Sequence, residues 1–155
     1  MDKWRRFRSL SRAERHVLLR ALALLPLTAV GLRLIGFHRW HSLLVRFGAG
    51  KSSAAEARGR NSLERAFLAA RMVNIAAREG VYRSNCLGQS LVLWWLLRQE
   101  GIASELRIGV RKQARRFQAH AWVERSGVVL NDSDEVHKHY APFDRSIVPV
   151  QAERR

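Results

Sequence analysis

Hydrophobic residues in the first part of the chain recur with the spacing of helices. Ser11 and Glu14 stand three residues apart, as in a capping box, so a helix should begin there, and Pro26 is expected to end or kink it. A second helical piece is expected over roughly 32–47. The small and polar residues at 48–61 then indicate a linker.

Two more helices are predicted before the pattern changes. Asn61-Ser-Leu-Glu64 is another capping box, and apolar residues follow it at helical spacing up to Gly80. Ser84-Asn85, good capping residues, precede the run 86–100, which Gly101 closes. Because this run is apolar almost all round, the helix should be buried at the centre of the domain.

After the last of these helices, apolar and polar residues alternate as they do in strands. We expect a strand near 104–110, an exposed basic loop at 111–116, and two more strands over 117–124 and 128–132. The last two strands would be joined through Arg125-Ser126-Gly127. Helices followed by short antiparallel strands indicate an α+β fold.

The net charge of +15 is unevenly distributed, because residues 1–60 carry +10 and residues 61–155 carry +5. We interpret 1–60 as a basic helical N-terminal region and 61–155 as the main domain, within one compact unit. Such a surface suits nucleic acid, anionic lipid or an acidic peptide. We do not expect nucleic acid, since no zinc-finger spacing, basic zipper or aromatic-studded sheet face is visible.

The apolar stretch at 17–37 is about long enough to span a membrane. Arg20, Pro26 and Arg33 interrupt it, and it lacks the cleavage site of a signal peptide. We therefore expect two amphipathic helices packed on the domain, with peripheral membrane contact left open.

Cys86 is the single cysteine of the sequence, and it falls in the first turn of the predicted central helix. Unpaired N–H groups and the helix dipole at that end favour a thiolate, the nucleophilic form. The alternative is a cysteine that only packs against the sheet. A lone cysteine also fits a reducing, cytoplasmic compartment.

His120 and Asp132 are the candidate partners of this thiol. If residues 125–127 form a three-residue loop with Gly127 left-handed, His120 lies directly across from Asp132 on one sheet face. The carboxylate could then hold one imidazole nitrogen and aim the other at the thiol. A two-residue turn would shift the register, and Asp134 is the fallback orienter.

The other histidines carry weaker signals. His137 and His139 stand in an acidic segment that could suggest a metal, but such crowded loops are usually solvated, so we expect no metal and no cofactor. His16, His38 and His41 are expected at the surface.

Several segments together resemble the lasso-peptide leader peptidases, which are transglutaminase-like cysteine proteases. The resemblance covers about 62–143 and lies in Cys86-Leu-Gly-Gln-Ser-Leu-Val-Leu, Leu106-Arg-Ile-Gly-Val, Phe117-Gln-Ala-His-Ala-Trp-Val-Glu and Gly127-Val-Val-Leu-Asn-Asp. It implies a transglutaminase/papain-like fold, with N-terminal helices and a central catalytic helix packed on a small antiparallel sheet. It also implies a catalytic triad of Cys86, His120 and Asp132.

The function implied by the resemblance is removal of the leader from a ribosomally made lasso precursor peptide. A separate cyclase would then close the macrolactam ring. Some members carry an added leader-recognition domain, for which this chain has no room before its helices, so we expect it to depend on a separate recognition protein. The alternatives are transglutaminase-type acyl transfer and a non-catalytic basic scaffold that binds peptide or membrane.

Overall fold

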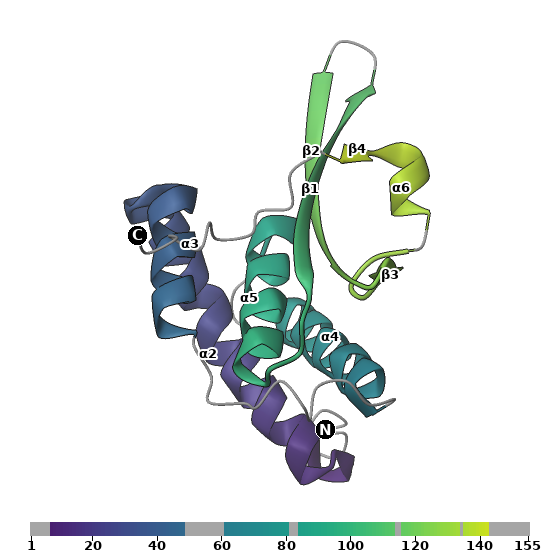
Figure 1. Cartoon of the computed structure of the whole chain (residues 1–155). Helices are drawn as coiled ribbons and strands as arrows, with labels where there is room; N and C mark the ends of the chain where they lie inside the picture. The colour runs from purple at the N-terminus through teal and green to yellow at the C-terminus, as the bar shows by residue number, and fades with distance from the viewer. Residues whose placement is uncertain (1–6, 49–60, 81–83, 114–115, 134, 143–155) are drawn as a thin grey trace, which may run out of the picture.

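The computed structural model describes residues 7–48, 61–80, 84–113, 116–133 and 135–142 (Figure 1). Helices α2 (Arg12–Leu34), α3 (Gly36–Phe47), α4 (Asn61–Glu79) and α5 (Cys86–Gln99) come first. They are followed by β1 (Glu105–Gln113), β2 (Arg116–Arg125), β3 (Val128–Val129), α6 (Val136–His139) and β4 (Ala141–Pro142). The predicted α+β class with a small antiparallel sheet is confirmed. The predicted linker lies almost wholly outside the described residues.

Helix α2 begins as predicted but ends later. Ser11 caps it in a complete capping box with Glu14. We expected Pro26 to end or kink this helix. The helix runs through Pro26, so the expectation that it ends there is wrong. Leu25 and Thr28, on either side of the proline, are both buried, and this packing outweighs the lost hydrogen bond. The helical run is interrupted only where α2 meets α3, at Ile35 and at Gly36, the first residue of α3, whose φ is +78°.

Helix α5 is the buried centre that its sequence predicted. Eight of its residues are buried, and Leu91, Leu93 and Leu97 have no exposed surface. Together with buried residues of α2 and α4, and with Leu106 and Val123 of the sheet, they form one hydrophobic core. Figure 1 shows α5 between these helices and the long β1–β2 hairpin. The helix therefore has almost no freedom to move its N-terminal end independently of the sheet.

His41 is buried, so the expectation that it lies at the surface is wrong. Its ring stacks between Phe37, at 5.7 Å, and Trp94, at 5.0 Å between centroids. Burial lowers the pKa of His41, and the nearby charges of His38 and Arg98 lower it further. This histidine thus belongs to the contact between α3 and α5.

The sheet has the strand order β3-β2-β1-β4, and β1 and β2 form most of it. The predicted basic loop at 111–116 is wrong, because Arg111 pairs with Gln118 and Lys112 with Phe117. These pairs extend the hairpin beyond the body of the protein, as Figure 1 shows. A strand section that buries neither face needs no apolar alternation, so the hydrophobic pattern could not reveal it.

The turn between β2 and β3 contains two residues and not the three that we predicted. Ser126 and Gly127 both have positive φ, 49° and 79°, as in a type I′ turn. Arg125 pairs with Val128 and Glu124 with Val129. The register is therefore shifted by one residue from the prediction, and β3 is shorter than predicted.

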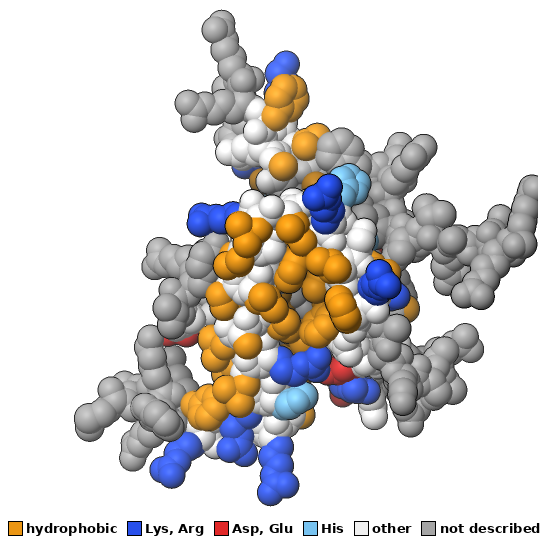
Figure 2. Space-filling model, turned by 90° about the vertical axis from the view of Figure 1, so that its left-hand side faces the viewer, with side chains coloured by type: hydrophobic (Ala, Val, Ile, Leu, Met, Phe, Trp, Pro, Cys, Tyr) orange, Lys and Arg blue, Asp and Glu red, His pale blue; other side chains and the backbone are white. Residues whose placement is uncertain are grey.

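The exposed face of α2 and α3 carries many large apolar side chains with arginines beside them (Figure 2). Its members are at least a third exposed: Leu19, Leu22, Leu27, Val30, Leu34, Ile35, Leu43 and Phe47. Helix α2 is long and apolar enough to cross a membrane by length and composition, and 33% of its most apolar window is buried within the protein.

Substitutions at Gly127 test the turn. A side chain at Gly127 would meet no atom within 4 Å, so its cost is backbone strain alone. Because asparagine tolerates the left-handed region, we expect Gly127→Asn to cost clearly less than Gly127→Val, which should lose about 1–2 kcal/mol in urea unfolding. Equal losses for the two variants would contradict a left-handed residue here.

Candidate active site

Cys86 is the first residue of α5, and the chain around it is held by hydrogen bonds. The Asn85 side chain caps the helix by accepting from the Gly88 backbone N–H at 2.8 Å. The Gln89 amide donates to the Ser84 carbonyl at 2.8 Å. A Cβ on Gly88 would lie 2.5 Å from the Ser84 hydroxyl, so a larger residue here would require the Ser84 side chain to move. Cys86 is half-buried, and its thiol makes no hydrogen bond with any described side chain.

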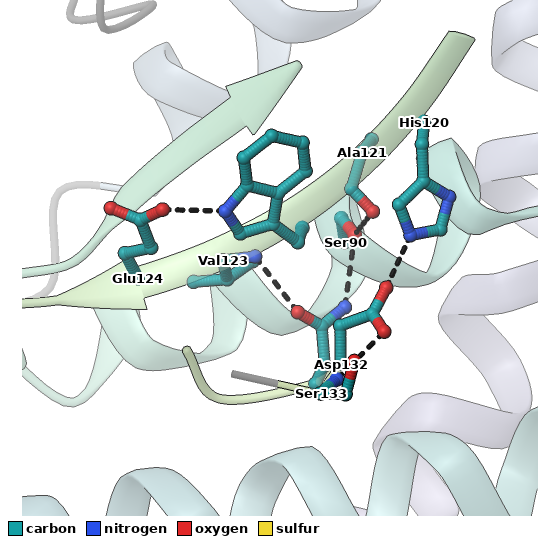
Figure 3. Close-up of polar contacts among 9 residues, drawn as sticks. Ser90, His120, Ala121, Val123, Glu124, Asp132 and Ser133 are labelled. Atoms are coloured by element: carbon teal, nitrogen blue, oxygen red, sulfur yellow. Dashed lines mark hydrogen bonds and ion pairs between the residues drawn. The ribbon is translucent and has the colours of Figure 1, made fainter. Parts of the chain in front are cut away.

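His120 of β2 and Asp132 make the most direct polar contact of the site. The His120 Nε2 donates to the Asp132 Oδ2, and the other carboxylate oxygen accepts from the Ser133 N–H at 2.7 Å (Figure 3). An ionised carboxylate can only accept, so Nε2 carries the proton. Nδ1 has no hydrogen-bond partner among the residues that the structure describes. It is therefore the nitrogen left to act as a base.

The contact between His120 and Asp132 was expected, but the structure makes it by a different route. Extending the observed register past Leu130 would place Asp132 opposite Ala121. Its side chain would then point to the face of Ala121, away from that of His120. β3 ends before that point, and the chain bends so that the carboxylate reaches the imidazole. The predicted cross-strand pairing is thus wrong, although the predicted partners meet.

Two aromatic rings flank the His120 imidazole. Trp122 lies at 6.2 Å between centroids and 23° between planes, and Tyr140 at 5.0 Å and 31°. The Arg111 guanidinium stands 4.9 Å from the centre of the Tyr140 ring. These contacts limit where the imidazole can turn. Tyr140 carried no signal in the sequence, because it follows the short helix α6 in a segment without periodicity.

Trp122 is anchored by a buried carboxylate that the sequence reading did not single out. Its indole N–H donates to Glu124 at 2.5 Å, and Glu124 also forms an ion pair with Arg107 at 3.4 Å. Glu124 is only 5% exposed, so pairing is needed to offset its desolvation. Successive side chains of a strand point to opposite faces, so residues 120, 122 and 124 share one face of the sheet. This spacing is the only sequence signal from which their proximity could have been predicted.

The N-terminal half of α5 touches β2 directly beside His120. The Ser90 hydroxyl donates to the carbonyl of Ala121 at 2.9 Å, and Ala121 is the next residue after His120. Ser90 follows Cys86 by four residues, about one helical turn, so both lie on the same side of α5. The helix start that carries the thiol and the strand that carries the imidazole are thereby tied together.

Among the described residues, no three histidine, cysteine or acidic side chains are arranged to hold a metal ion. His139 lies exposed in α6, while Asp134, the fallback orienter, lies outside the described residues.

The fold and sequence together define the class of this protein. The model of the transglutaminase-like superfamily matches residues 30–145, and the chain belongs to that superfamily.

Within that class, the chain is similar to the microcin J25-processing protein McjB of Escherichia coli. The two are 42% identical over 53 residues, which are 34% of this chain and 24% of McjB. The match thus spans about a quarter of the length of that relative. No solved structure matches the chain.

Gly109 offers a test of the aromatic wall around His120. It pairs with His120 across the sheet, and a Cβ there would lie 2.8 Å from the Trp122 ring and 3.0 Å from the Tyr140 Cβ. Gly109→Ala should therefore destabilise the protein by about 1–3 kcal/mol in urea unfolding, because the added methyl overpacks this contact.

A double-mutant cycle provides the control for that substitution. In a Trp122→Leu background the ring atoms are gone, so Gly109→Ala should cost clearly less than in the parent. Fully additive losses would show that the glycine is required for another reason.

Proposed function

We propose that this protein is a cysteine peptidase in which Cys86 is the nucleophile, His120 the general base and Asp132 its orienter. The observation that carries the proposal is the contact between His120 and Asp132, because His120 lies on strand β2 and the next residue of that strand accepts a hydrogen bond from Ser90 of the cysteine-bearing helix. Membership of the transglutaminase-like superfamily supports it, because that superfamily includes cysteine peptidases.

The reaction would be acyl transfer to the thiol and then to water. Nδ1 of His120 takes the thiol proton, the thiolate attacks the scissile carbonyl, and the imidazolium returns the proton to the leaving amine. Water then hydrolyses the thioester with His120 again as base. Asp132 holds the Nε2–H tautomer throughout, so that Nδ1 keeps its lone pair for the thiol.

The start of α5 would also stabilise the charge that develops on the carbonyl oxygen. Backbone N–H groups in the first turn of a helix have no partner within the helix. The N–H of Cys86 is the candidate oxyanion donor, aided by the positive end of the helix dipole.

The proposed substrate is the leader of a ribosomally made lasso precursor peptide. The similarity to McjB, a protein that processes microcin J25, supports this choice, together with the motifs around Cys86 and His120. Amide transfer, as in transglutaminases, would use the same three residues with an amine in place of water. Mass spectrometry of the products separates the two reactions, because hydrolysis adds water and releases a free carboxylate.

Replacing the thiol or the imidazole tests the mechanism. Cys86→Ala and His120→Ala should each lower cleavage of the precursor by about 1,000-fold or more, because the nucleophile and its base act as one unit. Asp132→Asn should retain more activity, since control of the tautomer is only partly lost. Cleavage is followed by mass spectrometry of the precursor.

His139→Ala is the matched control for His120→Ala, because His139 is exposed and outside the proposed triad. It should cleave at the parent rate, and all variants should keep the parent thermal unfolding curve. A Cys86→Ala protein that still cleaves the precursor at the parent rate would refute the role of Cys86 as the nucleophile.

Partner proteins are the second part of the proposal. We propose that a separate leader-recognition protein presents the precursor, and that the basic N-terminal third is its docking surface. The macrolactam cyclase is a further proposed partner. A cytoplasmic location stays a prediction. Peripheral membrane contact, for which the apolar face of α2 and α3 is the candidate surface, also stays a prediction.

Neutralising Arg5, Arg6 and Arg8 to glutamine should weaken binding of the recognition protein about tenfold, with a smaller loss at high salt. Isothermal titration measures the affinity. The control removes the same charge elsewhere, from Arg78, Lys112 and Lys138, which are exposed on other elements. Equal losses in the two triple variants would show that only net charge matters.

A further inference from the structure

The hydroxyl of Ser90 joins three segments of the chain that bear the proposed triad. Ser90 has no exposed surface. It donates to the carbonyl of Ala121 at 2.9 Å and accepts from the Asn131 side-chain amide at 2.9 Å. Ala121 directly follows His120, Asn131 directly precedes Asp132, and Ser90 lies one turn after Cys86. Figure 3 shows Ser90 beside the Asp132 segment, below β2.

Asn131 also replaces a backbone group at the end of β3. In a hydrogen-bonded pair of antiparallel strands, the two residues exchange two backbone bonds. Leu130 donates to the Val123 carbonyl at 2.9 Å, but the Val123 N–H donates to the Asn131 side chain at 2.8 Å. The amide oxygen therefore takes the place that the Leu130 carbonyl would have in a continuing ladder.

Ser90 replaces the next bond of that ladder. In the observed register Ala121 would pair with Asp132, whose N–H would donate to the Ala121 carbonyl. The Ser90 hydroxyl occupies that carbonyl instead. The side chains of Ser90 and Asn131 thus bind the backbone groups of β2 that would pair with a longer β3. Buried backbone groups need such partners.

Ending the ladder at this point is a condition for the His120–Asp132 contact. A continued ladder would turn the Asp132 side chain to the face of Ala121, away from the imidazole. We propose that Ser90 and Asn131 are positioning residues that end strand β3 and hold Asp132 against His120. The importance of this arrangement for catalysis rests on the proposed function, but the orientation of the His120 ring can be measured without any substrate.

The test uses Asn131→Leu, which keeps the size of the side chain and removes both of its hydrogen bonds. Asn74→Leu is the matched control, because Asn74 is a half-buried asparagine on α4, away from the site. The second variant is Ser90→Ala, with Ser104→Ala as its control. The Ser104 hydroxyl is buried and has no hydrogen-bond partner among the described residues, so its loss should change little.

The readout is the ring ¹⁵N spectrum of the histidines, with His120 assigned by a His120→Gln variant. In the parent, His120 should show the Nε2–H tautomer alone. Asn131→Leu and Ser90→Ala should show a mixture of tautomers, and the two controls the parent pattern. In an Asp132→Asn background Asn131→Leu should change nothing further, because both act on the same contact.

Activity gives the second readout. Asn131→Leu and Ser90→Ala should lower kcat for precursor cleavage about 10- to 100-fold with little change in KM, as expected for a misplaced orienter. Folded variants that keep the parent tautomer pattern of His120 would overturn the inference. If Asn131→Leu does not fold, Ser90→Ala decides in the same way. The parent protein could also cleave no precursor while Asn131→Leu and Ser90→Ala still change the tautomer of His120. That result would refute the proposed function and leave the positioning role standing.

Discussion

The packing of the apolar helix α5 against strand β2 is the contact on which the rest of the structure depends. Because α5 is buried on nearly all sides, it can neither rotate nor slide without opening the core. Its first turn, capped by Asn85, therefore has a fixed place relative to the sheet. The polar groups near Cys86 and His120 are held in place by this packing. A site built on packed elements keeps its geometry better than one on loops.

Much of the fold could be predicted from the sequence, because hydrophobic period and capping residues act locally. The start of α2 at Ser11, the buried α5 and the β1–β2 hairpin all follow from such signals. The failures arose where tertiary contacts outweigh local preference. Packing on both sides carries α2 through Pro26, and the basic residues near 111 pair as a strand although neither face is apolar.

The contact between His120 and Asp132 was predicted, but the way in which the chain makes it was not. The expected three-residue turn would have paired His120 with Asp132 by register alone, whereas the real turn at Ser126-Gly127 shifts the strands by one residue. Sequence cannot reveal that a bend after Leu130 compensates for this shift, because the bend depends on Ser90, far away along the chain. The partners met because a carboxylate three residues beyond a strand end has several ways to reach its neighbour.

The presence of one cysteine in these 155 residues has a consequence for the redox chemistry of the site. Cys86 is partly accessible, so peroxide can reach its sulfur and oxidise it to a sulfenic acid. Many redox-sensitive enzymes then form a disulfide with a second cysteine of their own, which protects the sulfur from further oxidation. These 155 residues hold no second cysteine, so within them no thiol could form such a disulfide, and a thiol from another molecule would have to take that part.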